Sequence, residues 1–239
     1  MEAQLTIIVP VFNEEDNIER LTDSLSTYMK KASTATKVLF INDGSSDNSL
    51  QLIKAVCSTS SHFEYLDFKQ NAGLSAAIKA GFDHSNTPLT GYLDADLQTD
   101  PEDFDLLLEH IGEYDLVTGV RANRKDSFLK NTSSKIANAI RNAFTHDGMD
   151  DTGCPLKIIK TEYAKKIPLF NGLHRFLPAM VLLQKGKIKQ IPVRHYERLA
   201  GKSSFGLSNR LIGPLIDCFA YLWMKKRYIN YEINEHDAN

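Results

Sequence analysis

The chain has 239 residues, of which 42% are hydrophobic and 24% are charged, and its formal net charge is −2. This is the composition of an ordinary globular protein, and the length suits one large α/β domain with a sizeable core. A charge so close to neutral gives no reason to expect a nucleic-acid partner. The three cysteines lie far apart and lack metal-ligand spacing, which favours reduced thiols in the cytoplasm.

The first residues of the chain do not have the pattern of a signal peptide. No basic region precedes the first apolar run, which is only five residues long. No apolar run approaches the roughly 18 uncharged residues that a membrane span needs. We therefore expect a cytoplasmic protein that is soluble or attaches peripherally to the cytoplasmic face of a membrane.

Short apolar runs alternate with helical patterns over residues 1–120, which predicts βαβ units and a mostly parallel central sheet flanked by helices. Asn13 with Asp16, and Ser45 or Ser46 before Asn48, are expected to start the first two helices. The expected strands cover residues 5–9, 37–41, 63–68, 89–93 and 116–119, and the expected helices cover residues 16–31, 47–58, 75–84 and 102–110.

The second half of the chain has a different pattern and reads as a continuation of the same domain. Helices are expected at residues 130–144, 175–185 and 207–224, and strands at residues 156–159 and 188–193. The sequence contains no internal repeat and no low-complexity linker that would divide it.

Polar side chains follow each of the five expected strands of the first half. Ligands of open α/β sheets bind beyond the carboxyl ends of the strands, so these residues are the expected site. Each segment alone could be an ordinary turn or helix cap, but five polar strand ends in one sheet favour a binding site. The segments are residues 10–15, 42–47, 70–73, 94–98 and 119–121.

The most informative segment is Asp94-Ala95-Asp96, at the end of the expected fourth strand. Alternate side chains of an extended segment share one face, so Asp94 and Asp96 can act together. Two carboxylates can hold a hard divalent ion such as Mg²⁺ or Mn²⁺, whose open positions a diphosphate could fill. The segment therefore predicts transfer from a nucleotide-diphosphate donor.

With these motifs in this order, the chain resembles the family 2 inverting glycosyltransferases with the GT-A fold, most of all the dolichyl-phosphate mannose synthase group and its bacterial polyprenyl-phosphate relatives. The resemblance covers roughly residues 4–206, and such an ordered set is more specific than any one motif. The matching segments are residues 9–14, 43–47, 71–73, 94–98 with 101–102, 119–121, 151–154 and 198–203.

The resemblance implies a role for each matching residue. Asp94 and Asp96 flank the sugar and hold the metal ion, Arg121 and Arg198 face phosphate groups, and Asp151 lies near the acceptor. The donor-binding residues that it implies are Pro10, Phe12, Glu14, Asp43, Asn71, Gln98, Arg198 and Lys202.

The late loop departs from the family pattern. Relatives commonly carry Gly-x-Ser-Lys there, with the lysine facing phosphate, whereas Ser204 stands at the lysine position and Lys202 lies two residues earlier. A polyprenyl phosphate is the expected acceptor, and a glycan hydroxyl is the alternative. A phosphate monoester is largely dianionic at neutral pH and needs no base, whereas a hydroxyl needs one, for which Asp151 is the candidate. We favour a positioning role for Asp151.

Basic residues gather in two loops of the second half, and such clusters fit an anionic acceptor. Arg121, Arg124, Lys125 and Lys130 form the first cluster, and Arg194, His195, Arg198 and Lys202 form the second. A solvated basic face is the alternative interpretation for Lys125 and Lys130.

The C-terminal segment carries apolar residues at helical spacing and ends in Trp223 followed by Lys225, Lys226 and Arg227. This pattern suits a helix at a membrane interface, and equally one that packs on the core or on a second copy. We expect a catalytic domain over residues 1–204, with a donor half over 1–120 and an acceptor half over 121–204, and then an amphipathic helix and polar tail over 205–239.

Two other functions are weaker alternatives. Nucleotidyl transfer usually needs a glycine-rich basic loop after the first strand, which residues 10–14 are not. A non-enzymatic sugar-nucleotide-binding subunit would not need the intact acidic pair. The sequence leaves open which sugar is moved, whether the donor carries uridine or guanosine, whether the chain is a homo-oligomer, and whether a membrane subunit anchors it.

Overall fold

A computed structural model describes residues 2–121, 138–196 and 212–231 of the chain. Arg198, Lys202 and Ser204 of the late loop lie outside these residues, as do Arg124, Lys125 and Lys130. The sequence predictions made for those six positions are therefore not tested by the fold.

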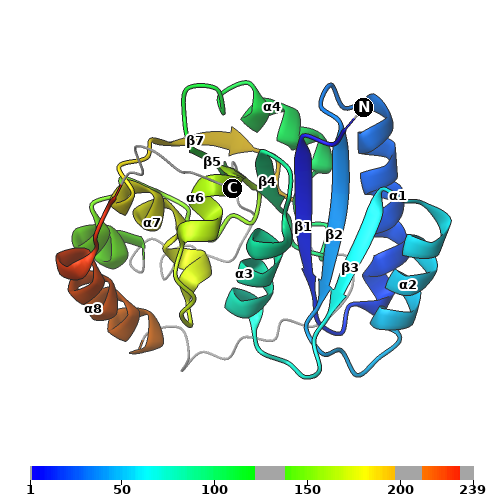
Figure 1. Cartoon of the computed structure of the whole chain (residues 1–239), viewed down its shortest axis with the longest axis horizontal. Helices are drawn as coiled ribbons and strands as arrows, with labels where there is room; N and C mark the ends of the chain where they lie inside the picture. The colour runs from blue at the N-terminus through cyan, green and yellow to red at the C-terminus, as the bar shows by residue number, and fades with distance from the viewer. Residues whose placement is uncertain (1, 122–137, 197–211, 232–239) are drawn as a thin grey trace, which may run out of the picture.

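One seven-stranded sheet runs through the described part of the chain, in the order β3-β2-β1-β4-β6-β5-β7 (Figure 1). Six strands run in the same direction, and β6 alone is antiparallel to its neighbours β4 and β5. The predicted α/β fold with a mostly parallel sheet is confirmed. The strands are β1 (Leu5–Val11), β2 (Thr36–Asn42), β3 (Phe63–Asp67), β4 (Leu89–Tyr92), β5 (Leu116–Arg121), β6 (Lys157–Lys160) and β7 (Ile188–Val193).

Helices cover both faces of the sheet, as Figure 1 shows for α1 and α3 on opposite sides of β1. Residues 138–145 are also helical. The other helices are α1 (Glu15–Lys31), α2 (Ser49–Thr59), α3 (Leu74–His84), α4 (Phe104–Leu108), α6 (Thr161–Lys166), α7 (Leu177–Leu183) and α8 (Ile212–Arg227), with 3₁₀ turns η1 (Pro101–Asp103) and η2 (Leu173–Arg175).

Alternation along the central strands divides the hydrophobic core into two layers. Ile7 and Val9 of β1 pack with α1 and α4 on one face, whereas Ile8 between them packs with α3 on the other. Because both faces are covered, β1 and β2 are almost continuously apolar, as buried parallel strands are.

The direction of the strands decides where polar residues meet. The carboxyl ends of β1, β2, β4 and β5 lie along one edge of the sheet because these strands run the same way. The antiparallel strand β6 begins at that edge, so its first residue, Lys157, also lies there. This edge is named the active edge below.

The predicted helix starts were wrong. The residues that precede α1 and α2 are Glu14 and Asn48, and neither side chain caps its helix. Asn13 instead has a φ of 55°, and its side-chain oxygen accepts a hydrogen bond from the backbone nitrogen of Ser46 at 2.8 Å. Polar residues of these two loops therefore also bind across to the other loop, beyond what a helix cap of their own would need.

Two predicted helices are also shorter and broken. The segment at 102–110 begins as η1 and continues as α4, and the segment at 175–185 is η2 followed by α7. Proline stands at the start of both, at Pro101 and Pro178, where its fixed φ and missing N–H suit a helix start and not a helix interior.

Helix α8 confirms that a helix forms near the C-terminus, although residues 207–211 of the predicted span lie outside the described residues. Its inner side is buried at Cys218 and Tyr221, and the Tyr221 ring stacks on Phe176 at 5.9 Å between centroids. Within the ranges that the structure describes, no helix combines the length and the apolar character of a membrane span.

Candidate active site

The loop after β2 is built around Asp43, a buried carboxylate at the active edge. Its oxygens accept hydrogen bonds from the backbone nitrogens of Ala72 at 2.7 Å and Gly73 at 2.9 Å, and from Nδ2 of Asn71 at 2.9 Å. Gly44 has a φ of 65°, and a Cβ there would stand 2.5 Å from the backbone nitrogen of Asn71. Asp43 and Gly44 thus fasten the loop after β3 to the loop after β2, and the nucleoside contact implied for Asp43 stays a prediction.

The loop after β1 offers an aromatic surface beside this fixed pair of loops. Pro10 is half-buried, and the Phe12 side chain is 40% exposed. The Glu14 carboxylate accepts a hydrogen bond from Nδ2 of Asn17 at 2.6 Å, and its backbone nitrogen donates to Oγ of Ser49 at 2.9 Å. An exposed ring on a rigid strand end is suited to stacking on a base.

Asp94 and Asp96 follow β4 at the centre of the active edge, and they lie close enough for their charges to interact, although residues 95–96 form a turn and not the predicted extended segment. The Tyr92 hydroxyl donates to Oδ1 of Asp94 at 2.5 Å, and the backbone nitrogen of Gln98 donates to Oδ1 of Asp96 at 3.1 Å. Burial, and after it the charge of Asp96, raises the pKa of the Asp94 carboxyl to about 6. Two acids that repel in this way would be stabilised by a cation between them.

The donor set at this position fits part of a divalent metal site. Carboxylates are the ligands that Mg²⁺ and Mn²⁺ prefer, and Gln98 adds an amide beside them. Within residues 2–121, 138–196 and 212–231, no group of three or more histidine, cysteine or acidic residues could hold an ion. Asp94 and Asp96 could therefore hold a metal only with further ligands, such as the oxygens of a bound diphosphate.

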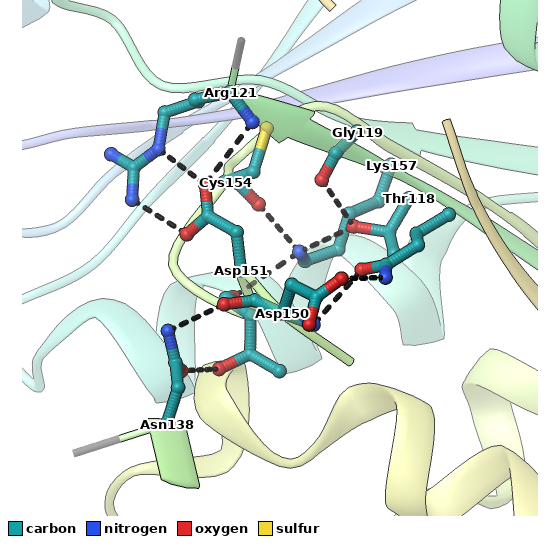
Figure 2. A network of polar contacts seen from close by, with 10 residues as sticks. Thr118, Gly119, Arg121, Asn138, Asp150, Asp151, Cys154 and Lys157 are labelled. Atoms are coloured by element: carbon teal, nitrogen blue, oxygen red, sulfur yellow. Dashed lines mark hydrogen bonds and ion pairs between the residues drawn. The ribbon is translucent and has the colours of Figure 1, made fainter. Parts of the chain in front are cut away.

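Arg121 and Asp151 form a bidentate ion pair at the end of β5 (Figure 2). Nε of Arg121 donates to Oδ2 of Asp151 at 2.7 Å, and its Nη2 donates to Oδ1 at 2.8 Å. Gly153 gives the guanidinium room, since a Cβ there would stand 3.1 Å from Nη2 of Arg121. The two residues were predicted separately, and no sequence pattern indicates that they pair.

Within the second basic cluster, Arg194 is bound by acids of a neighbouring segment, and Arg198 and Lys202 lie outside the described residues. Nε and Nη2 of Arg194 lie 2.8 and 2.7 Å from Oδ1 of Asp103, and its Nη1 lies 3.0 Å from Asp100. Its charge is thus engaged by two acids on the neighbouring turn rather than presented as part of a basic face. Arg194 also lines a hollow of about 940 Å³ beside α1, η1 and α4, away from Asp94 and Asp96.

Gln98 occupies the place that the sequence predicted, beside the acidic pair. Its backbone oxygen accepts from the nitrogen of Tyr196 at 2.9 Å, and its Nε2 donates to the Tyr196 oxygen at 3.3 Å. The segment that leads to the late loop is therefore attached directly to the segment of the acidic pair.

Tyr92 and Lys157 lie at the active edge and were not among the residues predicted for the site from the sequence. Lys157 is buried at the start of β6, and a lysine that opens an apolar strand was the only local sign of it. His174 lies 3.3 Å from the Ser75 hydroxyl at the start of α3, and burial lowers its pKa to about 3. Packing is the ordinary role of such a histidine, and its contact with Ser75 joins residues 99 positions apart in the sequence.

The family model for glycosyl transferase family 2 matches residues 6–168. The chain belongs to glycosyl transferase family 2. The prediction of this family, and of a glycosyltransferase, is confirmed by a match over more than half of the chain.

Two curated relatives are similar in sequence to this chain along most of its length. An undecaprenyl-phosphate 4-deoxy-4-formamido-L-arabinose transferase from Salmonella choleraesuis (strain SC-B67) is 34% identical over 216 residues, which is 90% of this chain and 66% of the relative. A dodecaprenyl-phosphate galacturonate synthase from Rhizobium johnstonii is 32% identical over 232 residues, 94% of this chain and 69% of the relative. The chain thus spans about two thirds of the length of these relatives.

Solved structures share the fold at low sequence identity. The glucosyl-3-phosphoglycerate synthase from Mycobacterium tuberculosis, crystallised with Mn²⁺, uridine-diphosphate-glucose and phosphoglyceric acid, superposes with a TM-score of 0.71 at 15% identity, over 95% of this chain and 81% of that one. This likeness confirms the GT-A fold that the sequence predicted.

Proposed function

We propose that this chain transfers a sugar from a nucleotide-diphosphate donor to a polyprenyl phosphate, with a divalent metal ion held at Asp94 and Asp96. The relatives named for undecaprenyl-phosphate and dodecaprenyl-phosphate chemistry support this acceptor class. The observation that carries the proposal within the structure is the pairing of Asp151 with Arg121, because it bears on which acceptor needs a base.

On the donor side, the chain provides a fixed frame for the nucleotide. Phe12 offers a ring for the base, and the loops fastened by Asp43 border the same edge. Mg²⁺ or Mn²⁺ at Asp94 and Asp96 would supply Lewis-acid stabilisation of the charge on the departing diphosphate. Because the two carboxylates are fixed by Tyr92 and by the backbone of Gln98, little reorganisation is needed when that charge develops.

On the acceptor side, the pairing with Arg121 makes Asp151 a poor general base. A carboxylate held by two guanidinium hydrogen bonds is stabilised in its charged form and binds a proton weakly. A polyprenyl phosphate does not need that base, since its phosphate is already largely ionised at neutral pH. A glycan hydroxyl would need one, so this arrangement favours the phosphate acceptor.

The outer face of α8 supports contact with a membrane that contains such an acceptor. Ile216, Phe219 and Trp223 are 62%, 59% and 66% exposed, while the opposite side of the helix packs on the core. Lys225, Lys226 and Arg227 follow at the exposed end. An apolar stripe that ends in tryptophan and basic residues is typical of a helix at a bilayer interface with anionic lipids.

The acceptor is tested by supplying labelled uridine- and guanosine-diphosphate sugars with Mn²⁺ and either undecaprenyl phosphate or neutral oligosaccharides. We expect a labelled lipid-linked sugar with one of the donors and no transfer to the oligosaccharides. Transfer to the oligosaccharides alone would contradict the phosphate acceptor while leaving the donor chemistry intact.

The membrane contact is tested separately, by sedimentation with vesicles that contain anionic phospholipids. Replacing Phe219 and Trp223 with serine should release the protein from the vesicles, and Leu52→Ser on α2, which is exposed to a lesser degree, is the matched control. Equal sedimentation of both variants and the unchanged protein would contradict an interfacial role for α8.

A further inference from the structure

Lys157 lies in the middle of the active edge and is only 2% exposed. In the register of the sheet it stands opposite Tyr92 of β4 and opposite Thr118 of β5, so the three side chains form one row across three strands. Residues directly opposite each other in a sheet share a face. The row therefore extends from the tyrosine that binds Asp94 to the strand that ends in Arg121.

The amino group of Lys157 binds three neutral oxygens (Figure 2). It donates to Oγ1 of Thr118 at 2.9 Å, to the backbone oxygen of Thr152 at 3.3 Å, and to the backbone oxygen of Cys154. A lysine ammonium has three protons to donate, so its hydrogen-bonding capacity is fully used. None of these three acceptors is a carboxylate.

Two of those acceptors belong to the loop that carries Asp151, and other elements hold the same loop. Gln190 of β7 accepts from the backbone nitrogen of Asp150 at 3.0 Å and donates to the Asp150 carboxylate at 2.7 Å. Nδ2 of Asn138 donates to the Asp150 backbone oxygen at 2.7 Å. Gln190 and Asn138 thus fix the N-terminal part of the loop over residues 150–154, and Lys157 fixes its C-terminal part.

Filling space alone does not explain a lysine at this position. A buried amino group loses its hydration, and burial lowers the pKa of Lys157 accordingly. An apolar side chain of the same length would fill the space without that cost. The ammonium donates to the two backbone oxygens that flank Gly153, and Gly153 lies beside the Arg121–Asp151 pair.

We propose that Lys157 is a positioning residue of the transfer reaction: it fixes the 151–154 loop, and through Asp151 it sets the position of the Arg121 guanidinium at the active edge. This proposal rests on the proposed function for its catalytic consequence, but its structural part does not. If Lys157 acts through Asp151, then Asp151 should matter much less once Lys157 is replaced.

A double-mutant cycle measures this dependence. Lys157→Met should lower kcat for transfer by at least about tenfold, and Asp151→Asn by about five- to tenfold in the unchanged protein but by less than about twofold beside Lys157→Met. Lys160→Met is the matched control, since it removes a lysine of the same strand that pairs with Asp115 instead, and it should keep kcat within about twofold. Independent, multiplicative losses would overturn the proposal.

Hydrogen exchange gives a readout that needs no substrate. In Lys157→Met the amides of residues 150–156 should exchange faster, while those of α1 keep their protection. Unchanged exchange in the loop would overturn the proposal even if activity fell. A failure of the unchanged protein to glycosylate polyprenyl phosphate would contradict the proposed function alone.

Thr118→Val covers the case in which Lys157→Met does not fold. It removes one acceptor of the ammonium and keeps the shape of the side chain. We expect a smaller fall in kcat, about threefold or more, and faster exchange in the same loop. Normal kcat and normal loop exchange in a folded Thr118→Val protein would count against the role of Lys157.

Discussion

The two halves of the active edge are held together by different interactions. Beside β1, β2 and β3, side chains bind backbone groups of neighbouring loops, as Asp43 binds Ala72 and Gly73. Beside β5 and β6, charged side chains bind each other or loop oxygens, as Arg121 binds Asp151. The first half makes a rigid frame, and the second half makes a region in which charge is already balanced.

Asp94 and Asp96 lie where these halves meet, directly after β4. Tyr92 and the backbone of Gln98 fix their positions without supplying a positive charge. Burial and the neighbouring charge of Asp96 raise the pKa of the Asp94 carboxyl, although the charges of Lys157 and Arg121 act in the opposite direction. The proposed function places the cation at the acidic pair and the orientation of the acceptor at the Arg121–Asp151 pair, and this difference is what the following variants test.

The largest effect is expected at the acidic pair. Asp96→Ala should lower transfer by about 10³-fold or more with little change in melting temperature, because a metal ligand that stabilises transition-state charge is lost. Asp83→Asn, an exposed acid on α3, is the control and should keep normal activity. Substantial turnover of Asp96→Ala would contradict the proposed role of Asp96 in holding a metal ion.

The next effect is expected at the bidentate pair. Arg121→Lys keeps the charge but cannot form both parallel hydrogen bonds to Asp151, so transfer should fall by about ten- to a hundredfold. Steady-state kinetics with varied acceptor would show this loss. Activity equal to that of the unchanged protein would mean that charge alone, and not geometry, matters at Arg121.

Asp43→Asn should weaken the attachment between the loops after β2 and β3 and should affect the rate of transfer less. The replacement puts an amide where two backbone N–H groups and Asn71 now donate, which should lower the free energy of unfolding by about 1–3 kcal/mol. Donor KM should rise more than kcat falls. Chemical denaturation checks the first effect, with Asp23→Asn on the exposed side of α1 as control, and an unchanged midpoint for Asp43→Asn would contradict the framing role.

The smallest effect is expected in how the stability of the protein depends on pH, and it concerns His174. Burial, followed by the charges of Arg175 and Lys157, lowers the pKa of His174 to about 3, whereas an unfolded histidine titrates near about 6.5. Between these values the unfolded state binds a proton that the folded state does not, so this residue costs stability as the pH falls below about 6.5. His174→Gln should therefore lose less stability than the unchanged protein between pH 7 and pH 5.

Melting temperatures at the two pH values measure this difference. His62→Gln, which changes an exposed histidine, should retain the pH dependence of the unchanged protein. The same pH dependence in His174→Gln would show that His174 is not held neutral by its surroundings.

The sequence predicts the parts of the fold that depend on local pattern. Residues 188–193 form β7 as expected. Asp94 and Asp96 lie at the active edge because they directly follow a strand whose apolar pattern is a local property, although residues 95–96 form a turn rather than the expected extended segment. The order of strong motifs was enough to identify the family.

Tertiary pairing was not predictable from the sequence. Asn13 resembles a helix cap, but Ser46, 33 positions away, binds it in the folded chain. The sequence predicts Arg194 as part of a basic cluster, but in the fold it binds Asp103, which is 91 positions away. Two acceptors of Lys157, Thr152 and Cys154, are near it in the sequence, but Thr118 is 39 positions away and becomes its neighbour only when β6 pairs with β5.

The most direct test is a crystal structure of the protein with Mn²⁺ and a sugar nucleotide that it binds. Anomalous scattering should place one manganese ion about 2.0–2.3 Å from a carboxylate oxygen of Asp96, with the donor diphosphate completing its ligands. A bound sugar nucleotide with no ion beside Asp94 and Asp96 would contradict metal-assisted transfer at the active edge.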